Sequence, residues 1–262
     1  MPDPSKSAMR FVAWVLVPLV IAIAAAAWFL LDPGFRSAPK SAAGTPKNEF
    51  EQRVRDYLLE HPEVIIEAIE RYQERKRGAE QSEAQAVLKA RADEVFRDPD
   101  SPVGGNANGD ATLVEFFDYN CAYCRRVDPL MKQLEAADAK LRIVYKEIPI
   151  LGPNSVFAAK AALAAHRQGK YLAFHKSLMT VEGISDKDKV IEVATKIGLD
   201  LDRLRRDMED PAIQKMIERN LALAQALHIN GTPSFVAGDK IVRGAIELDA
   251  LEALVRDTRE KK

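Results

Sequence analysis

The feature that most constrains the fold is the pair Cys121 and Cys124, the only two cysteines in the 262-residue chain. They follow the β-rich apolar run ATLVEFFDYN (111–120), and from Val127 onward apolar residues recur at helical spacing, so a helix begins at the pair. A second strand pattern, LRIVYKEIPI (141–150), comes next. Strand, helix and strand in this order predict an α/β fold built on a βαβ unit with a right-handed crossover.

Three kinds of chemistry use two thiols at this spacing: a structural disulfide, a metal site and a redox pair. A disulfide-dependent scaffold carries many more cysteines than two, so stapling does not explain the pair. A structural zinc site takes four ligands, commonly as two closely spaced pairs. The chain has four histidines, and no two of them lie at a spacing typical of metal ligands. They are His61, His166, His175 and His228. We therefore expect no zinc site, whereas soft Cu(I), which needs only two thiolates, stays open for Cys121 and Cys124.

The redox interpretation follows from the position of the pair at the start of a helix. Free backbone N–H groups and the helix dipole stabilise negative charge there, so they lower a thiol pKa and favour the thiolate that attacks disulfides. Cys121 lies at that end and is the predicted nucleophile. Cys124 lies one turn further in and is the predicted resolving thiol, which releases a mixed disulfide.

Composition sets the broad class. Apolar residues make up 47% of the chain and charged residues 29%, values typical of a folded protein. The formal net charge of −1 gives no electrostatic reason to expect a nucleic-acid partner.

The N-terminus predicts export. Residues 11–31 form an uncharged apolar run, long enough to cross a bilayer as a helix. Lys6 and Arg10 precede it and favour a cytoplasmic N-terminus over residues 1–10, with the rest of the chain exported. The alternative is a cleaved signal peptide, whose apolar core is usually shorter, about 7–15 residues. The length favours an uncleaved signal anchor, and either arrangement exposes the thiols to oxidising conditions.

Two segments separate this run from the cysteine-containing region. Residues 32–47, rich in Pro, Gly, Ser and Ala, are predicted to be a linker. Residues 48–97 show helical periodicity, with a break at His61 and Pro62, where Pro62 suits the first turn of a second helix. This segment is predicted to be either a helical pair packed on the main domain or an arm for self-association.

The main domain is predicted over 98–262, because turn formers dominate residues 98–110 and mark a boundary. After the second strand, residues 153–228 are almost wholly helical in pattern and form an insertion. A hairpin follows, with strands at 234–237 and 240–244, and then a last amphipathic helix.

The stretches GDATLVEFFDYNCAYCRR and NGTPSF resemble the DsbA-type thioredoxin-fold oxidoreductases of bacterial envelopes, a resemblance that covers about 99–258. The preceding FEQRVRDYLLEHPEVIIEAIE resembles the suppressor-of-copper-sensitivity C (ScsC-like) subgroup, some members of which oligomerise through that segment. The resemblance implies a thioredoxin fold with a helical insertion. It also implies that Cys121 and Cys124 form a redox-active disulfide that needs no further cofactor.

The resemblance assigns further site residues. Glu115 matches the buried acid that accepts a proton when Cys124 must deprotonate, although the alternation of the strand leaves open whether it faces the interior or solvent. Thr232 and Pro233 match the cis-proline loop that binds the substrate strand. Lys146 is matched to a charged residue near the acid.

One position departs from the strong oxidases of this family. Where they carry His before the second cysteine, this chain has Tyr123, which adds no positive charge beside the thiolate. Arg125 and Arg126 either compensate in part or form a solvated face. We therefore expect an isomerase or reductase of exported proteins rather than a strong oxidase, with Cu(I) binding as the alternative. The expected setting is the bacterial inner membrane, with a single span, a periplasmic catalytic domain (soluble if the signal is cleaved), a membrane redox partner and a homo-oligomer formed through 48–97.

Overall fold

The computed structural model describes residues 48–260. The expected span at 11–31 and linker at 32–47 lie outside the described residues. Among the helices of residues 48–260, none has the length and apolar composition needed to cross a bilayer. The chain divides into two compact units, Met1–Glu70 and Arg71–Lys262.

The described part of the first unit is helical. Helix α2 (Glu49–Glu60) begins at Asn48, whose side chain accepts a hydrogen bond from the Glu51 N–H at 2.8 Å. Helix α3 (Glu63–Ala90) begins directly after Pro62 and continues into the second unit, so the predicted break at His61 and Pro62 is confirmed. Many large apolar side chains of this unit are exposed: Phe50, Val54, Tyr57, Leu59, Ile65, Ile66 and Ile69.

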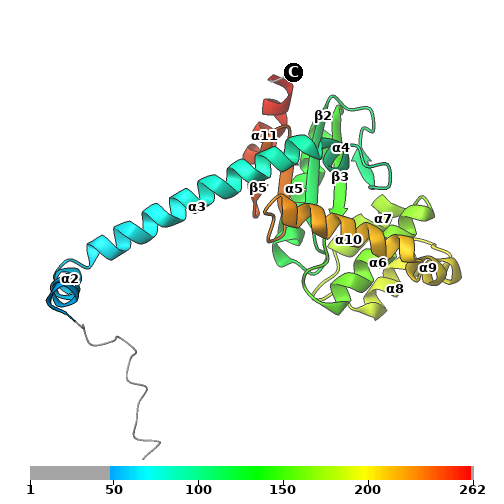
Figure 1. Ribbon diagram of the computed structural model, residues 1–262. Helices are drawn as coiled ribbons and strands as arrows, with labels where there is room; N and C mark the ends of the chain where they lie inside the picture. Colours follow the sequence, from blue (N-terminus) through cyan, green and yellow to red (C-terminus); the bar gives the residue numbers. More distant parts are fainter. Residues whose placement is uncertain (1–47, 261–262) are drawn as a thin grey trace, which may run out of the picture. The chain divides into compact units, whose positions relative to one another are not determined.

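The second unit is built on a five-stranded sheet in the order β1-β3-β2-β4-β5. Strands β2, β3 and β5 are labelled in Figure 1. The strands are β1 (Val103–Gly105), β2 (Ala111–Phe117), β3 (Leu141–Glu147), β4 (Ser234–Ala237) and β5 (Lys240–Arg243). Strands β2 and β3 are parallel and the other pairs are antiparallel. Helix α5 (Ala122–Ala137) connects β2 to β3, so the predicted βαβ unit and the later hairpin are both present.

Helices cover both faces of the sheet. Successive strand residues point to opposite faces, and accordingly Leu113 and Phe117 join a buried cluster with α5 and α11, whereas Val114 and Phe116 join a second cluster with Leu88 of α3. Helices α4 and α10 also contribute to the second cluster. These helices are α4 (Ala92–Phe96), α10 (Pro211–Ala226) and α11 (Leu248–Glu260).

The helical block expected over 153–228 is present as five helices between β3 and β4. They are α6 (Pro153–Arg167), α7 (Tyr171–Met179), α8 (Lys187–Lys196), α9 (Leu201–Met208) and α10. Asp210 caps α10 by accepting from the Ala212 N–H at 2.8 Å, with Pro211 in the first turn, as the sequence predicts. The result is a thioredoxin fold with a helical insertion.

The later part of the predicted helical arm packs in the second unit. Ala84 and Leu88 of α3 and Val95 of α4 are buried there, so this unit begins upstream of the turn-rich segment 98–110. Strand β1, within that segment, has no counterpart in the sequence prediction. Its three residues, Val-Gly-Gly, are too few to show an alternating pattern, and only pairing with β3 defines them as a strand.

Candidate active site

The two cysteines lie where β2 gives way to α5. Cys121 is the N-cap of α5, in an extended conformation (φ −78°, ψ 116°), and its N–H donates to the Asp118 carbonyl at 3.0 Å. Cys124 lies in the first turn and is fully buried, whereas Cys121 keeps 6% of its surface exposed. The thiol at the helix start is therefore the one nearer to the surface.

The environment separates the two thiol pKa values widely. The pKa of Cys121 falls from 9.0 to about 5, because the Cys124 thiol, Thr232 and the backbone N–H groups of Cys124 and Tyr123 all stabilise its thiolate against the opposing cost of burial. Burial first, and then the neighbouring Cys121 and Glu115, raise the pKa of Cys124 well above its ordinary value. At neutral pH the reduced pair therefore carries one thiolate, on Cys121.

The Thr232–Pro233 loop lies beside the nucleophile. The Thr232–Pro233 peptide bond is cis, as expected. The sulfur of Cys121 is 3.2 Å from the Thr232 carbonyl oxygen. The loop leads directly into β4, and its Pro233 carbonyl accepts a hydrogen bond from the Gly244 N–H at 2.9 Å. The cis-proline loop therefore flanks the sulfur that a substrate must reach.

Glu115 is buried in the centre of β2. It is 2% exposed and lies between Tyr145 of β3 and Phe235 of β4 in the register of the sheet. Burial raises its pKa from 4.5 to about 8, and the charges of Asp128 and Cys121 act in the same direction. The alternative that Glu115 faces solvent is thus wrong.

Lys146 does not lie beside Glu115. It pairs in register with Phe116, so its side chain points to the opposite face of the sheet from that of Glu115. There its Nζ is 3.0 Å from Asp98 Oδ2 and donates to Ser101 Oγ at 2.8 Å. The match to a charged residue near the acid is therefore wrong, and Lys146 anchors the segment that leads into β1.

Tyr123 and the two arginines after the pair have different surroundings. Tyr123 is 58% exposed, and the guanidinium of Arg126 stacks over its ring at 5.0 Å. Arg125 instead donates to the carbonyls of Tyr119 at 2.8 Å and Val181 at 2.7 Å, and also to the Gly183 carbonyl. Its primary role in the structure is to fasten the loop between α7 and α8 to the start of α5.

Asp118 and Asn120 organise the active-site loop, and sequence reasoning did not single them out. Asp118 Oδ2 accepts from the N–H groups of Ile150 and Leu151 at 2.9 and 3.0 Å. Asn120 Oδ1 accepts from the Ser185 N–H at 2.7 Å. Asp and Asn shortly before a helix are turn and capping residues, and the Asn120 N–H does donate to Asp118 Oδ1 at 2.8 Å. The other partners named here lie far along the chain.

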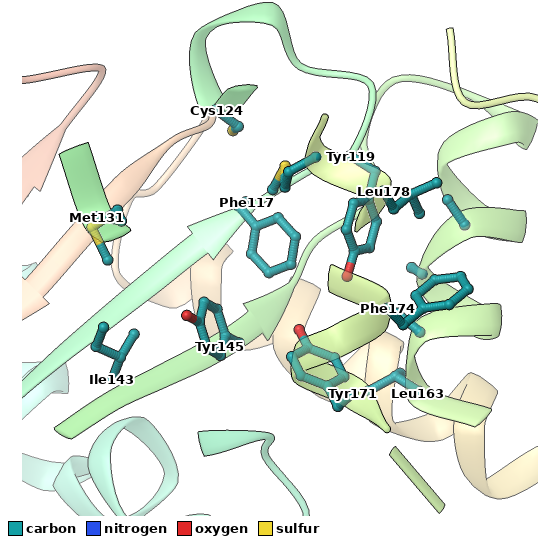
Figure 2. Close-up of a cluster of buried hydrophobic side chains, with 14 of the residues drawn as sticks. Phe117, Tyr119, Cys124, Met131, Ile143, Tyr145, Leu163, Tyr171, Phe174 and Leu178 are labelled. Carbon is teal, nitrogen blue, oxygen red and sulfur yellow. The ribbon is translucent and has the colours of Figure 1, made fainter. Parts of the chain in front are cut away.

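A buried polar cluster includes two of the rings labelled in Figure 2, those of Tyr119 and Tyr171. Tyr171 donates to Glu147 Oε1 at 2.8 Å, and the Tyr119 hydroxyl lies 3.3 Å from the same oxygen and 3.2 Å from His175 Nδ1. Burial lowers the pKa of His175 to about 3, so its imidazole is neutral. His175 also approaches Asp128, which follows Cys124 by four residues, with 4.0 Å between Nε2 and Oδ1. The four-residue spacing from Cys124, which places Asp128 on the same face of α5, is the one feature of the local sequence that could have identified Asp128.

Metal-ligating side chains do not gather in the described part of the chain. Across residues 48–260, no group of three or more His, Cys, Asp or Glu side chains is placed to hold a metal ion. The residues that could contact a two-coordinate ion are Cys121 and Cys124.

Comparison with known proteins gives a consistent result. Residues 112–256 match the DSBA-like thioredoxin domain, and residues 47–79 match the copper resistance protein ScsC N-terminal domain. A thioredoxin-like oxidoreductase from Silicibacter pomeroyi is 50% identical, with a TM-score of 0.63 over 64% of this chain and 97% of that one. A linker-deletion mutant of Proteus mirabilis ScsC is 29% identical, with a TM-score of 0.64 over 85% of this chain and 100% of that one.

Curated relatives include the Na(+)/H(+) antiporter NhaA of Herminiimonas arsenicoxydans, 30% identical over 158 residues. The match covers 60% of this chain but only 25% of the antiporter, so the chain spans about a quarter of that relative's length. The shared part is a domain, and the antiport activity named for the relative is not carried over. On the domain match, the fold and the cysteine geometry, the chain belongs to the DsbA-like thioredoxin family of thiol–disulfide oxidoreductases, with an ScsC-type segment before its thioredoxin domain.

Proposed function

We propose that the protein exchanges disulfides with exported proteins through Cys121 and Cys124. The observation that carries the proposal is the difference between the two thiols. Cys121, at the helix start beside the Thr232 carbonyl, keeps 6% of its surface exposed and has a pKa of about 5, whereas Cys124, one turn behind it, is fully buried and neutral. Such a pair can attack a disulfide and then resolve the product.

The proposed reaction has two steps. The Cys121 thiolate attacks a client disulfide, forms a mixed disulfide and expels one client thiolate, which takes a proton from water. Cys124 then gives its proton to the Glu115 carboxylate and attacks the Cys121 sulfur, which yields the Cys121–Cys124 disulfide and the second client thiolate. Because the charge on Cys121 helps to raise the Glu115 pKa, its loss in the mixed disulfide lowers that pKa and leaves more of Glu115 ionised to accept the proton. When a client thiol attacks the mixed disulfide instead, the net reaction is isomerisation.

For the direction of exchange we infer an isomerase or reductase rather than a strong oxidase. Tyr123 supplies no cation at the position that most affects the thiolate, and the exposed apolar side chains of the first unit support an oligomer that could enclose misfolded clients. The low Cys121 pKa acts in the opposite direction, because a stabilised thiolate makes the disulfide more oxidising. The reduction potential against glutathione decides between the two. A value near those of strong oxidases such as DsbA, about −120 mV, would overturn this inference.

The setting is part of the same proposal. The apolar run at 11–31 supports a single span in the bacterial inner membrane with the thioredoxin domain in the periplasm, or a soluble periplasmic form if the run is cleaved. A membrane redox partner would then reset the pair, and no further cofactor is needed. Self-association through 48–97 rests on the exposed apolar residues of α2 and early α3.

The second candidate function is Cu(I) binding by the same two thiolates. It is favoured by the match of residues 47–79 to a domain named for copper resistance. One experiment compares the candidates: exchange with a protein disulfide, and Cu(I) titration, for the wild type and Cys121→Ala. We expect exchange in the wild type and none in the variant. Tight Cu(I) binding without exchange would favour the second candidate.

A further inference from the structure

Strand β5 is an edge strand, because it pairs with β4 on one side and is the last strand of the sheet. Successive residues of an antiparallel strand direct their backbone N–H and C=O groups alternately toward the partner strand and away from it. The Gly244 N–H donates to the Pro233 carbonyl at 2.9 Å, so every second residue counted back from Gly244 faces β4. The backbone groups of Ile241 and Arg243 therefore point outward, and no hydrogen bond within residues 48–260 reaches them.

A groove of about 500 Å³ lies between β5 and helix α3. Residues 239–243 line it on the strand side, and Gln81, Ala84 and Gln85 line it on the helix side. Gln85 joins the two sides, because its Nε2 donates to the Asp239 carbonyl at 2.5 Å. A further strand along the outer edge of β5 would therefore find backbone partners on that strand and room for its side chains in the groove.

The free edge begins next to the nucleophile. Gly244, directly after β5, is hydrogen-bonded to Pro233, and the Thr232 carbonyl oxygen is 3.2 Å from the Cys121 sulfur. Neighbouring strands lie about 4.8 Å apart, so an added strand would lie two such spacings from the cis-proline loop. About four extended residues cover that distance and reach Cys121. A polypeptide can thus lie along β5 and react at Cys121 at the same time.

We propose that the outer edge of β5 binds an extended segment of the client polypeptide as an added strand, while Cys121 attacks a client cysteine about four residues away. The inference rests on the proposed exchange activity and defines its substrate class as chains with an extended segment near the disulfide. Main-chain hydrogen bonds provide the affinity in strand addition of this kind. Because every residue except proline carries both backbone groups, the edge accepts many client sequences.

The occupant is a client and not a second copy of this chain. Strand β5 is only four residues long, and its two exposed side chains, Lys240 and Arg243, are both cationic. Short length and charged side chains oppose edge-to-edge pairing of identical strands. An extended client segment with neutral or acidic side chains meets no such repulsion, and the edge is continuous with the loop that flanks the nucleophile.

The first test uses the reduced full-length protein and synthetic peptides whose single cysteine is disulfide-linked to glutathione. One peptide carries the strand-forming segment Thr-Val-Thr-Val-Thr about four residues from the cysteine, in two versions with the segment on either side, and the control carries a flexible Gly-Ser segment instead. In one of the two versions, we expect the rate constant for attack by Cys121 to exceed that of the control about tenfold, the gain from two net backbone hydrogen bonds. N-methylation of alternate amides in the segment gives a matched pair: one set of methyl groups should abolish the gain, and the other set should not.

A pair of protein variants tests the same edge from the other side. Ile241→Pro removes an outward N–H group and breaks no hydrogen bond of the hairpin, and its ring blocks the approach of an added strand. The ratio of the two rate constants should fall close to one in this variant. Ile241→Ala, which loses the side chain but keeps the N–H group, should retain the ratio. Because the ratio is taken within each variant, a general loss of activity does not affect it.

The second test locates the bound segment. Cys124→Ala is linked through Cys121 to the strand-forming peptide, and its amide hydrogen exchange is compared by NMR with that of the same variant linked to glutathione. We expect exchange at Ile241 and Arg243 to be slower in the peptide complex, by about tenfold or more.

Three results would contradict this account in different ways. Equal rate constants for the two peptides, or unchanged exchange at Ile241 and Arg243, would overturn the β5 site while the exchange activity stands. Protection of these amides without peptide, rising with protein concentration, would assign the edge to a second copy of the chain. No reaction with either peptide would overturn the proposed function and this inference with it.

Discussion

At the scale of single residues, the start of α5 separates two chemically identical thiols. Cys121 receives hydrogen bonds from backbone N–H groups and from the Cys124 thiol, all of which favour its charged form. Cys124 is packed among apolar side chains, where a charge costs most. Position in the helix therefore assigns the proposed roles of nucleophile and resolving thiol.

The Cys121 pKa leads to a direct prediction. In the reduced protein, alkylation of Cys121 by iodoacetamide should rise with pH about a midpoint near 5, while Cys124 stays unreactive. Because this pKa is depressed in the folded state, its contribution to stability is present above the unfolded value of 9.0 and is lost as the pH falls through about 5. Mass spectrometry of the alkylated peptides measures the midpoint. A midpoint near 9 would contradict the account of the helix start.

The contribution of Glu115 to stability should depend on pH in the opposite direction to that of Cys121. Its folded pKa of about 8 exceeds 4.5, so its contribution is present below pH 4.5 and is lost as the pH rises through about 8. In the wild type, the opposite pH dependence of stability contributed by Cys121 masks this fall. In a Cys121→Ala background, we expect the free energy of unfolding to fall with pH across this window, by up to about 1.4 kcal/mol per unit. Adding Glu115→Gln should remove the fall in urea titrations. Equal slopes in both backgrounds would mean that Glu115 is not the titrating group.

Lys146 shows where residue-level prediction ends. A period of two places neighbouring strand residues on opposite faces, so the facing of Lys146 follows from the register of β3 against β2. That register depends on pairing between distant segments, which a local pattern does not contain. The cysteines were identifiable from the motif and its strand–helix context, whereas Glu115 was identified through the family resemblance, which left its facing open.

At the scale of elements, helices α2 and α3 combine two kinds of surface. In the first unit large apolar residues are exposed, which is unfavourable for a lone chain in water. In the second unit Leu88 of α3 is buried in the cluster beneath the sheet. The two interpretations of the segment 48–97 thus apply to different parts of it, with packing for its later part and proposed self-association for its earlier part.

Self-association can be measured on a fragment that starts at residue 48. We expect this fragment to be oligomeric. A fragment that starts at Arg71 should be monomeric and still redox active, because it retains Leu88 and Val95 of the second cluster. Ile65→Asp with Ile69→Asp should also give a monomer, whereas Gln73→Asp should not. Light scattering distinguishes these outcomes. A monomeric fragment from residue 48 would remove the argument for an oligomer.

We predict that Arg125 holds the loop between α7 and α8 in its observed conformation. This guanidinium donates to the Val181 and Gly183 carbonyls and to Ser185 Oγ at 2.8 Å. Loss of such charge-assisted bonds costs about 1.5 kcal/mol or more. Arg125→Ala should therefore speed hydrogen exchange over residues 181–185, while Arg126→Ala, which only removes a contact with Tyr123, should not. Unchanged exchange in Arg125→Ala would show that other contacts hold the loop.

At the scale of the whole molecule, strong local patterns predicted the framework. The β-rich apolar run of β2, the helical spacing in α5 and the Asp-Pro start of α10 each specify an element within a few residues. The bonds of Asp118 to Ile150 and Leu151, and the approach of His175 to Asp128, join segments that are far apart in sequence. Only the assembled fold brings such partners together, which is why sequence reasoning missed them.

The measurement that tests the central claim most directly is the trapping of mixed disulfides by single-cysteine variants. The account predicts that Cys124→Ala accumulates covalent complexes with disulfide-containing clients, because the Cys121 thiolate still attacks and nothing resolves the product. It predicts that Cys121→Ala forms none, because Cys124 is buried and neutral. Non-reducing electrophoresis with mass spectrometry of the linked peptides reads both results. Equal trapping by the two variants, or trapping through Cys124 alone, would contradict the assignment of Cys121 as the nucleophile.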